Sequence, residues 1–227
     1  PEEYHRLYTE SYRLRKEAAE RLHADRMAFI RSHRQSPLAL YVANEMISKS
    51  FSVPATDLEE ILARNCRISD TARAARFCRQ AEQACYFCKD IHYPDVPLHT
   101  PTFDTTLLSA HIRPGHVTLI DCWASWRGPC RAAIPKVKAL YDKYGRDRFD
   151  VISISLDSKK EDWQKALEEE KMPWPQFIAG NRGYKQLTSR YNISSIPNLI
   201  LIDGKGQVVC NTFSPEEIRI ELEQILR

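Results

Sequence analysis

The sequence lacks the features that mark a membrane protein or a nucleic-acid-binding protein. No apolar run approaches the roughly 18 residues that a membrane-spanning helix needs, so we expect no transmembrane segment in this chain. Lys and Arg outnumber Asp and Glu by only 33 to 30, and no stripe of basic and aromatic residues stands out, which argues against a nucleic acid as a partner. The chain opens at Pro1 with charged residues instead of a basic stretch followed by an apolar core, so no signal peptide is expected here.

The composition is that of an ordinary globular protein. Hydrophobic residues make up 43% and charged residues 28% of the 227 residues, which is enough for one large domain or two small ones with proper cores. The seven cysteines are an odd number, so at least one is unpaired within a monomer, and their count alone leaves the redox compartment open. They are Cys66, Cys78, Cys85, Cys88, Cys122, Cys130 and Cys210.

Residues 1–90 have the apolar periodicity of helices and form the first predicted domain, an all-α bundle or arm. Residues 3–33 predict one long helix, and Ser36-Pro37 predicts the start of a second. Thr56 and Glu59 resemble a capping box for a third helix, and Ser69 or Asp70 would cap a fourth that runs to about Cys88. We interpret the mixed charges on these helices as solvated faces.

Residues 95–227 form the second predicted domain, in which strands and helices alternate. Four prolines between His92 and Pro114 predict a linker with an edge strand. The predicted strands are 116–122, 149–156, 198–202 and 207–210, the last two joined as a hairpin by Asp203–Gly206. Asp157 or Ser158 would cap a helix between strands, and Ser214–Glu217 would start the last helix with a capping box and a proline. This order predicts an α/β fold, with a mixed sheet and helices on both faces.

The segment Asp121–Arg131 (DCWASWRGPCR) lies where the predicted central strand gives way to a helix. It resembles the active-site segment of the TlpA/ResA-like thiol–disulfide oxidoreductases of bacterial envelopes, which read Trp-Ala-Ser-Trp-Cys-Gly-Pro-Cys-Arg. Pro135 stands where this family kinks its first helix, Ile196-Pro197 resembles the family's cis-proline, and residues 198–209 resemble its closing hairpin. The resemblance covers roughly residues 95–227.

The resemblance implies a thioredoxin-like fold, no cofactor and no metal, and protein or peptide thiols and disulfides as partners. It implies a location in the bacterial envelope, either periplasmic or anchored by a segment outside this chain. Cys130 matches the resolving cysteine, and Asp121 matches the buried acid that assists proton transfer to it. The substrate-binding rim would consist of Trp126, Arg127, Pro129, Ile196 and Pro197.

The sequence departs from the family at the nucleophile. A cysteine at the N-terminus of a helix is stabilised as a thiolate by free backbone N–H groups and the helix dipole, so it attacks a disulfide that the second cysteine then resolves. Position 127 carries Arg instead, and a guanidinium cannot attack. The ordinary dithiol cycle therefore cannot run on Cys130 alone.

Other readings remain open for several residues. Cys130 is either an inert relic or a thiol that keeps some chemistry beside Arg127, and Asp121 is either a proton carrier or a structural remnant. Trp126 belongs either to the substrate rim or to the packing, and Cys122 is expected in the core.

A second Cys-x-x-Cys, formed by Cys85 and Cys88, offers a replacement redox pair, although the sequence favours helix-borne cysteines in packing positions over this alternative. Together with His92 it has a spacing that zinc ligands use, but no fourth ligand is evident.

The sequence supports two functional hypotheses, an enzyme and a binding module. The first is a thioredoxin-like thiol–disulfide oxidoreductase, active in protein disulfide exchange and cell redox homeostasis, with impaired or lost dithiol activity. The second is a redox-inactive thioredoxin-fold module that binds a peptide or protein partner. An insulin-reduction assay on the protein and on Arg127→Cys would separate them.

Overall fold

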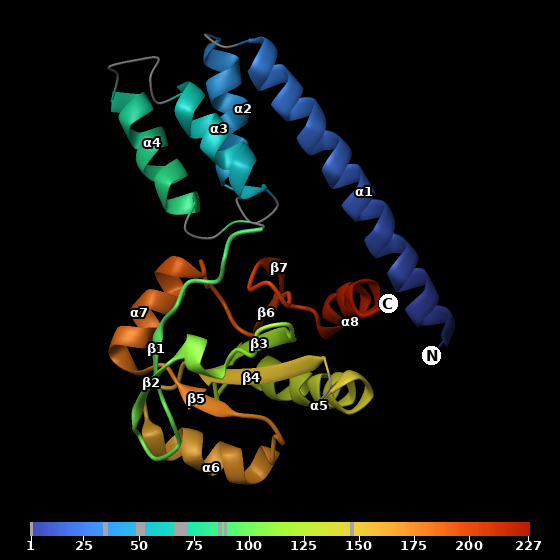
Figure 1. Cartoon of the computed structure of the whole chain (residues 1–227), viewed down its shortest axis with the longest axis vertical. Coiled ribbons are helices and arrows are strands. Elements are labelled where there is room, and N and C mark those ends of the chain that lie inside the picture. The colour runs from blue at the N-terminus through green and yellow to red at the C-terminus, as the bar shows by residue number, and fades with distance from the viewer. Residues whose placement is uncertain are drawn as a thin grey trace. The chain divides into compact units, whose positions relative to one another are not determined.

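The computed structural model describes residues 2–33, 36–48, 53–65, 72–85, 88, 90–145 and 148–227. The chain divides into two compact units, Pro1–Ile91 and His92–Arg227 (Figure 1). Each unit has its own core. None of the helices in the described ranges is long and apolar enough to cross a membrane.

The first unit consists of helices α1 (Glu2–Ser32), α2 (Pro37–Ile47), α3 (Ala55–Asn65) and α4 (Ala72–Cys85). Ser36 caps α2 by accepting a hydrogen bond from the Leu38 N–H at 3.2 Å, and Pro37 fills the first helical position, where its missing N–H costs nothing. The helices pack around one apolar cluster, whose members include Met27, Ile30, Ala43, Met46, Leu58, Ile61, Phe77, Ala81 and Cys88.

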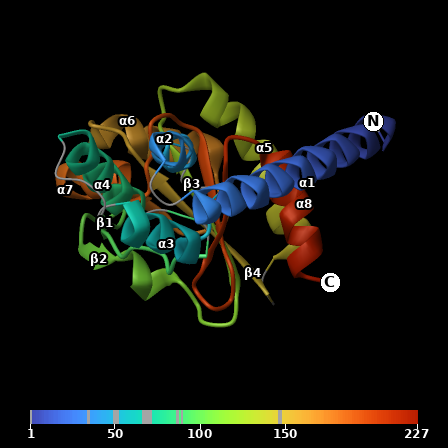
Figure 2. The same ribbon diagram turned by 90° about the horizontal axis from the view of Figure 1, so that it is seen from above.

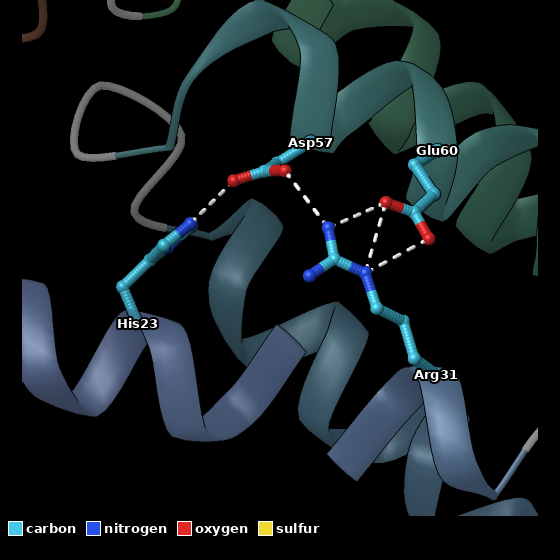
Figure 3. Close-up of polar contacts among 4 residues, drawn as sticks. All are labelled: His23, Arg31, Asp57 and Glu60. Carbon is cyan, nitrogen blue, oxygen red and sulfur yellow. Dashed lines mark hydrogen bonds and ion pairs between the residues drawn. The ribbon is translucent and has the colours of Figure 1, made fainter. Parts of the chain in front are cut away.

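A polar cluster joins α1 to α3 beside this core (Figure 3). His23 Nε2 lies 2.7 Å from Asp57 Oδ2, and Arg31 Nη2 donates to Glu60 Oε2 at 2.7 Å and to Asp57 Oδ1 at 3.4 Å. Both carboxylates are more than three-quarters buried at their side chains. The cluster fixes which faces of α1 and α3 meet, more than 25 residues apart in sequence.

The second unit is built on a seven-stranded sheet with the order β2-β1-β5-β4-β3-β6-β7. Strands β3, β4 and β5 run parallel, whereas β1, β2, β6 and β7 pair antiparallel with their neighbours. The strands are β1 (Pro97–His99), β2 (Thr105–Leu107), β3 (Val117–Trp123), β4 (Phe149–Ser155), β5 (Gln176–Ile178), β6 (Asn198–Ile202) and β7 (Val208–Thr212).

The helices cover the sheet on both sides, as Figures 1 and 2 show. α5 (Gly128–Tyr144) and α8 (Pro215–Ile225) pack on one face through Val137, Leu140, Ile218 and Leu222. α6 (Lys160–Glu170) is tied to α5 by Arg131, and α7 (Gly180–Arg190) lies across the sheet from α5. A short 3₁₀ helix, Leu108–His111, follows β2. The predicted α/β fold with a mixed sheet is confirmed.

Several predicted element ends are wrong. α3 begins at Ala55, so Thr56 lies inside it, and α6 has Lys159, not Asp157 or Ser158, at its N-cap. Ser214 is the N-cap of α8, but its side chain makes no capping hydrogen bond. The reciprocal bond of the capping box is also replaced, because the Ser214 N–H donates to Thr212 Oγ1 at 3.1 Å and Glu217 accepts from Thr212 at 2.5 Å. α4 ends at Cys85, before Cys88. The proposed caps Ser69 and Asp70 lie outside the described residues.

Candidate functional site

The site lies at the carboxyl end of the central strand β3. The strand ends at Trp123, a turn leads through Trp126, and α5 begins at Gly128 with Arg127 as its N-cap residue. Trp126 is 69% exposed, whereas Cys130 in the first turn of α5 is 2% exposed. The turn therefore presents an aromatic ring to solvent and keeps its thiol inside.

Arg127 links the turn to a second loop of the site. Its Nε donates a hydrogen bond to the backbone oxygen of Ile196, and the peptide bond between Ile196 and Pro197 is cis. Ile196 is buried and Pro197 half-buried, while Pro129 on α5 is exposed. The structure thus brings Arg127 and Ile196 together, with Pro197 beside them in the chain, and places Trp126 and Pro129 on the exposed side of the turn.

The thiol of Cys130 is held in its neutral form. The pKa of Cys130 is raised from 9.0 to about 11, first by burial and then by the charges of Asp121 and Asp157, and the Ala124 backbone and the Arg127 charge offset this increase only in part. A thiol with such a pKa is almost entirely protonated at pH 7, and the thiol is a poor nucleophile. Cys130 and Cys122 are both free thiols.

Asp121 is a buried acid on the same face of the sheet as α5. It is 3% exposed and accepts a hydrogen bond from Ser153 Oγ at 2.9 Å, and Ser153 in turn accepts one from Trp174 Nε1 at 2.8 Å. Burial raises the pKa of Asp121 to about 6, although the Ser153 hydrogen bond lowers it. An acid with this pKa exchanges protons near neutral pH.

Cys122 follows Asp121 on β3 and therefore faces the other side of the sheet. It lies opposite Asn198 of the neighbouring strand β6 and is fully buried. Burial raises the pKa of Cys122 well above the ordinary value for a thiol. These features fit the core position expected from the sequence.

Asp157 is a residue of the site that the sequence analysis did not find. It is 6% exposed and accepts three hydrogen bonds, from the Ser125 N–H at 2.9 Å, from Ser125 Oγ at 2.7 Å and from Ser155 Oγ at 2.6 Å. These bonds tie the end of β4 to the turn that carries Trp126 and Arg127. The sequence could have indicated Asp157, because it follows β4, which runs parallel to β3. The carboxyl ends of neighbouring parallel strands meet at one edge of a sheet.

The second cysteine pair lies in the other unit. Cys85 is the last residue of α4 and Cys88 is fully buried in the core of the first unit, whereas Cys130 belongs to the second unit. Cys78, also on α4, is disulfide-bonded. Over the described ranges, no group of three or more His, Cys, Asp or Glu residues is arranged to hold a metal ion.

Comparison with known proteins assigns the second unit. The model of the thioredoxin-like family matches residues 115–208. A solved structure of a candidate thiol:disulfide interchange protein DsbE from Chlorobium tepidum is 31% identical, with a TM-score of 0.51, and the match covers 62% of this chain and 96% of that one. The chain belongs to the thioredoxin-like family.

The thioredoxin-like unit has further relatives among thiol–disulfide oxidoreductases. Thiol-disulfide oxidoreductase ResA of Geobacillus kaustophilus is 25% identical over 114 residues, which cover 49% of this chain and 64% of ResA. The thioredoxin domain of an oxidoreductase from Bacteroides vulgatus has the same fold, with a TM-score of 0.55 over 60% of this chain and 97% of that domain, at 23% identity. The chain spans between 22% and 64% of the length of the first curated relatives that it matches.

Proposed function

We propose that this protein is a member of the thioredoxin-like thiol–disulfide oxidoreductases whose dithiol exchange is impaired or lost because Arg127 occupies the nucleophile position. One observation carries the proposal. Arg127 is the N-cap residue of α5, three positions before the buried Cys130, which is where the attacking cysteine of a Cys-x-x-Cys motif would stand. The proposed wider role is protein disulfide exchange in cell redox homeostasis.

The chemistry of such a site needs two sulfurs. The first thiolate attacks a disulfide and forms a mixed disulfide, and the second thiolate displaces it and closes a new bond. The N-terminus of α5 would lower the pKa of a thiol at position 127. Position 127 carries a guanidinium, so this stabilisation has no thiolate to act on. Cys130 does not substitute, because it is buried and its pKa is raised to about 11.

Asp121 and the rim residues complete the proposed site. Asp121 would carry protons to and from Cys130, since its pKa of about 6 and its burial on the α5 face suit that task. Trp126, Arg127, Pro129, Ile196 and Pro197 would contact protein or peptide substrates. The resemblance to envelope oxidoreductases and the disulfide at Cys78 favour an oxidising compartment, the bacterial envelope, as the location.

An insulin-reduction assay with dithiothreitol tests the proposal. We expect the protein to be slower than a dithiol thioredoxin by about two orders of magnitude or more, because an essential catalytic group is missing. Arg127→Cys should recover most of this loss, and Arg127→Lys, which keeps the charge but adds no sulfur, should not. A variant with Ser at both Cys85 and Cys88 removes the second pair, so activity that disappears with it would assign the chemistry to that pair instead.

The second candidate is a redox-inactive module that binds a peptide or protein. The hydrogen bond from Arg127 to the Ile196 carbonyl favours this candidate, because the arginine then stabilises the loop that carries Ile196 and Pro197 and needs no redox role. The exposed Trp126 supplies a large apolar contact of the kind that dominates interfaces. If Arg127→Cys forms no disulfide with Cys130 and stays inactive on insulin, this candidate is favoured over the first.

A further inference from the structure

A pocket of about 420 Å³ lies between α2 and α4 in the first unit, and its lining residues are distinct from those of the thioredoxin-like site. On α2 it is lined by Pro37, Leu40, Tyr41 and Asn44, which recur at helical spacing on one face, and on α4 by Arg76, Phe77 and Gln80. The opposite face of α2 packs into the core through Ala39, Ala43, Met46 and Ile47. The volume lies within the range of small-molecule sites.

The pocket has an apolar wall and unengaged polar groups. Phe77 is 3% exposed and Leu40 is half-buried against the same core, so these side chains form a fixed hydrophobic surface. Within the described parts of the chain, no hydrogen bond or ion pair engages the side chains of Tyr41, Asn44, Arg76 or Gln80. An apolar wall with a few convergent polar groups is the usual composition of a ligand site.

Arg76 decides the charge of the ligand. Other arginines of the protein hold carboxylates, such as Arg31 with Glu60 and Arg131 with Glu170. Arg76 lines the pocket with its guanidinium unpaired over the described ranges, and none of the described lining residues carries a carboxylate. A guanidinium binds a carboxylate through two parallel hydrogen bonds, and the amides of Asn44 and Gln80 add further donors.

We propose that the α2–α4 pocket binds a small organic carboxylate with an apolar or aromatic tail. The carboxylate would pair with Arg76, and the tail would lie against Leu40 and Phe77, with Tyr41 as a further lining residue. This function is independent of the thioredoxin-like site, and it gives the helical unit a ligand of its own.

Titration of the full chain with 4-phenylbutyrate, followed by amide chemical shifts, tests the proposal. We expect saturable shifts confined to residues of α2 and α4, and weaker binding by about tenfold or more for the neutral amide 4-phenylbutanamide, because a charge-assisted pair is lost. Acetate, which has no tail, should bind more weakly still.

Arg76→Gln should weaken 4-phenylbutyrate binding by about tenfold. Arg79→Gln is the matched control, because Arg79 is exposed on the same helix but does not line the pocket, and this variant should bind as the unchanged protein does. Equal affinity for the acid and its amide, equal losses in both variants, or no shifts at millimolar 4-phenylbutyrate would each overturn the proposal. The amide spectra of both variants also show whether they remain folded.

Discussion

At the scale of single residues, the site is defined by two buried titratable groups whose charged forms the protein disfavours. Cys130 and Asp121 are 2% and 3% exposed, and burial is the first cause of the raised pKa in both. The sequence could place both residues, because they flank a recognisable turn. It could not predict Ser153 and Trp174 as the partners of Asp121, since these contacts depend on the register of β3 with β4 and on the loop before β5.

Cys130 should react slowly with iodoacetamide in the native protein at neutral pH. Because its pKa is raised to about 11, the reactive thiolate fraction at pH 7.5 is small, and the rate should increase about tenfold per pH unit between pH 7 and 9. Mass spectrometry of the peptide that contains Cys130 measures this rate, and the denatured protein provides the reference. Modification of native Cys130 at pH 7 as fast as a free cysteine would show that the thiol is activated.

Asp121→Asn should stabilise the protein at pH 7.5 and not at pH 4. The folded-state pKa of Asp121 is raised from 3.8 to about 6, so the folded state binds its proton more tightly than the unfolded state, and stability falls as the pH rises from about 4 to 6. The penalty is about 2–3 kcal/mol above pH 6, and Asn avoids it. Urea unfolding at both pH values measures the difference. A gain that is equal at both, or one matched by the exposed control Asp142→Asn, would contradict this origin.

At the scale of elements, the long strands and helices could be predicted near their bounds, whereas the bounds of the short strands could not, although the prolines after His92 predict an edge strand and β2 is one. β3 is a mostly apolar run, and α5 follows a recognisable turn, so the sequence predicts both near their observed bounds. β1, β2 and β5 have three residues each, too few for any periodicity, and are strands only because neighbours pair with them. Two predicted capping residues make other contacts in the structure. Asp157 accepts from Ser125, and Glu217 accepts from Thr212.

Asp157→Ala should destabilise the second unit by about 2–4 kcal/mol, because it leaves the Ser125 N–H and two hydroxyls without their buried charged acceptor. It should also loosen the turn that carries Trp126, which is 69% exposed. Urea unfolding and the amide spectrum of residues 124–127 measure the two effects. Ser158→Ala, at an exposed neighbouring position, is the control. A loss below about 0.5 kcal/mol, the scale of ordinary surface changes, would contradict a structural role for Asp157.

At the scale of the whole molecule, the two units have separate cores. The core cluster of the sheet with α5 and α8 contains residues from 117 to 226 only, and the helical cluster contains residues from 27 to 91. A change from helical periodicity to alternating strands near residue 90 was visible in the sequence, because each pattern is local. The contacts that close each core were not visible, because they join residues far apart in the chain.

A fragment of residues 92–227 should therefore fold by itself. All seven strands and both helices of its core lie within it. Its amide spectrum should overlay on that of the full chain for residues of β3, β4 and α5, and its urea unfolding should be a single cooperative transition. A collapsed spectrum, together with loss of the near-ultraviolet signal of Trp163 and Trp174, would show that the helical unit is needed for folding.

The central claim is that the thioredoxin-like site lacks only one sulfur atom, at position 127. The most direct measurement is the disulfide content of Arg127→Cys after mild oxidation, by thiol titration and by mass spectrometry of the peptide that contains residues 127–130. The account predicts one new disulfide between the introduced thiol and Cys130, because Gly128 and Pro129 form the first turn of α5. Residues at the two ends of such a turn are expected to meet the Cα separation of about 4.4–6.8 Å that a disulfide needs. An introduced thiol that stays free under these conditions, in a variant with a native amide spectrum, would contradict it.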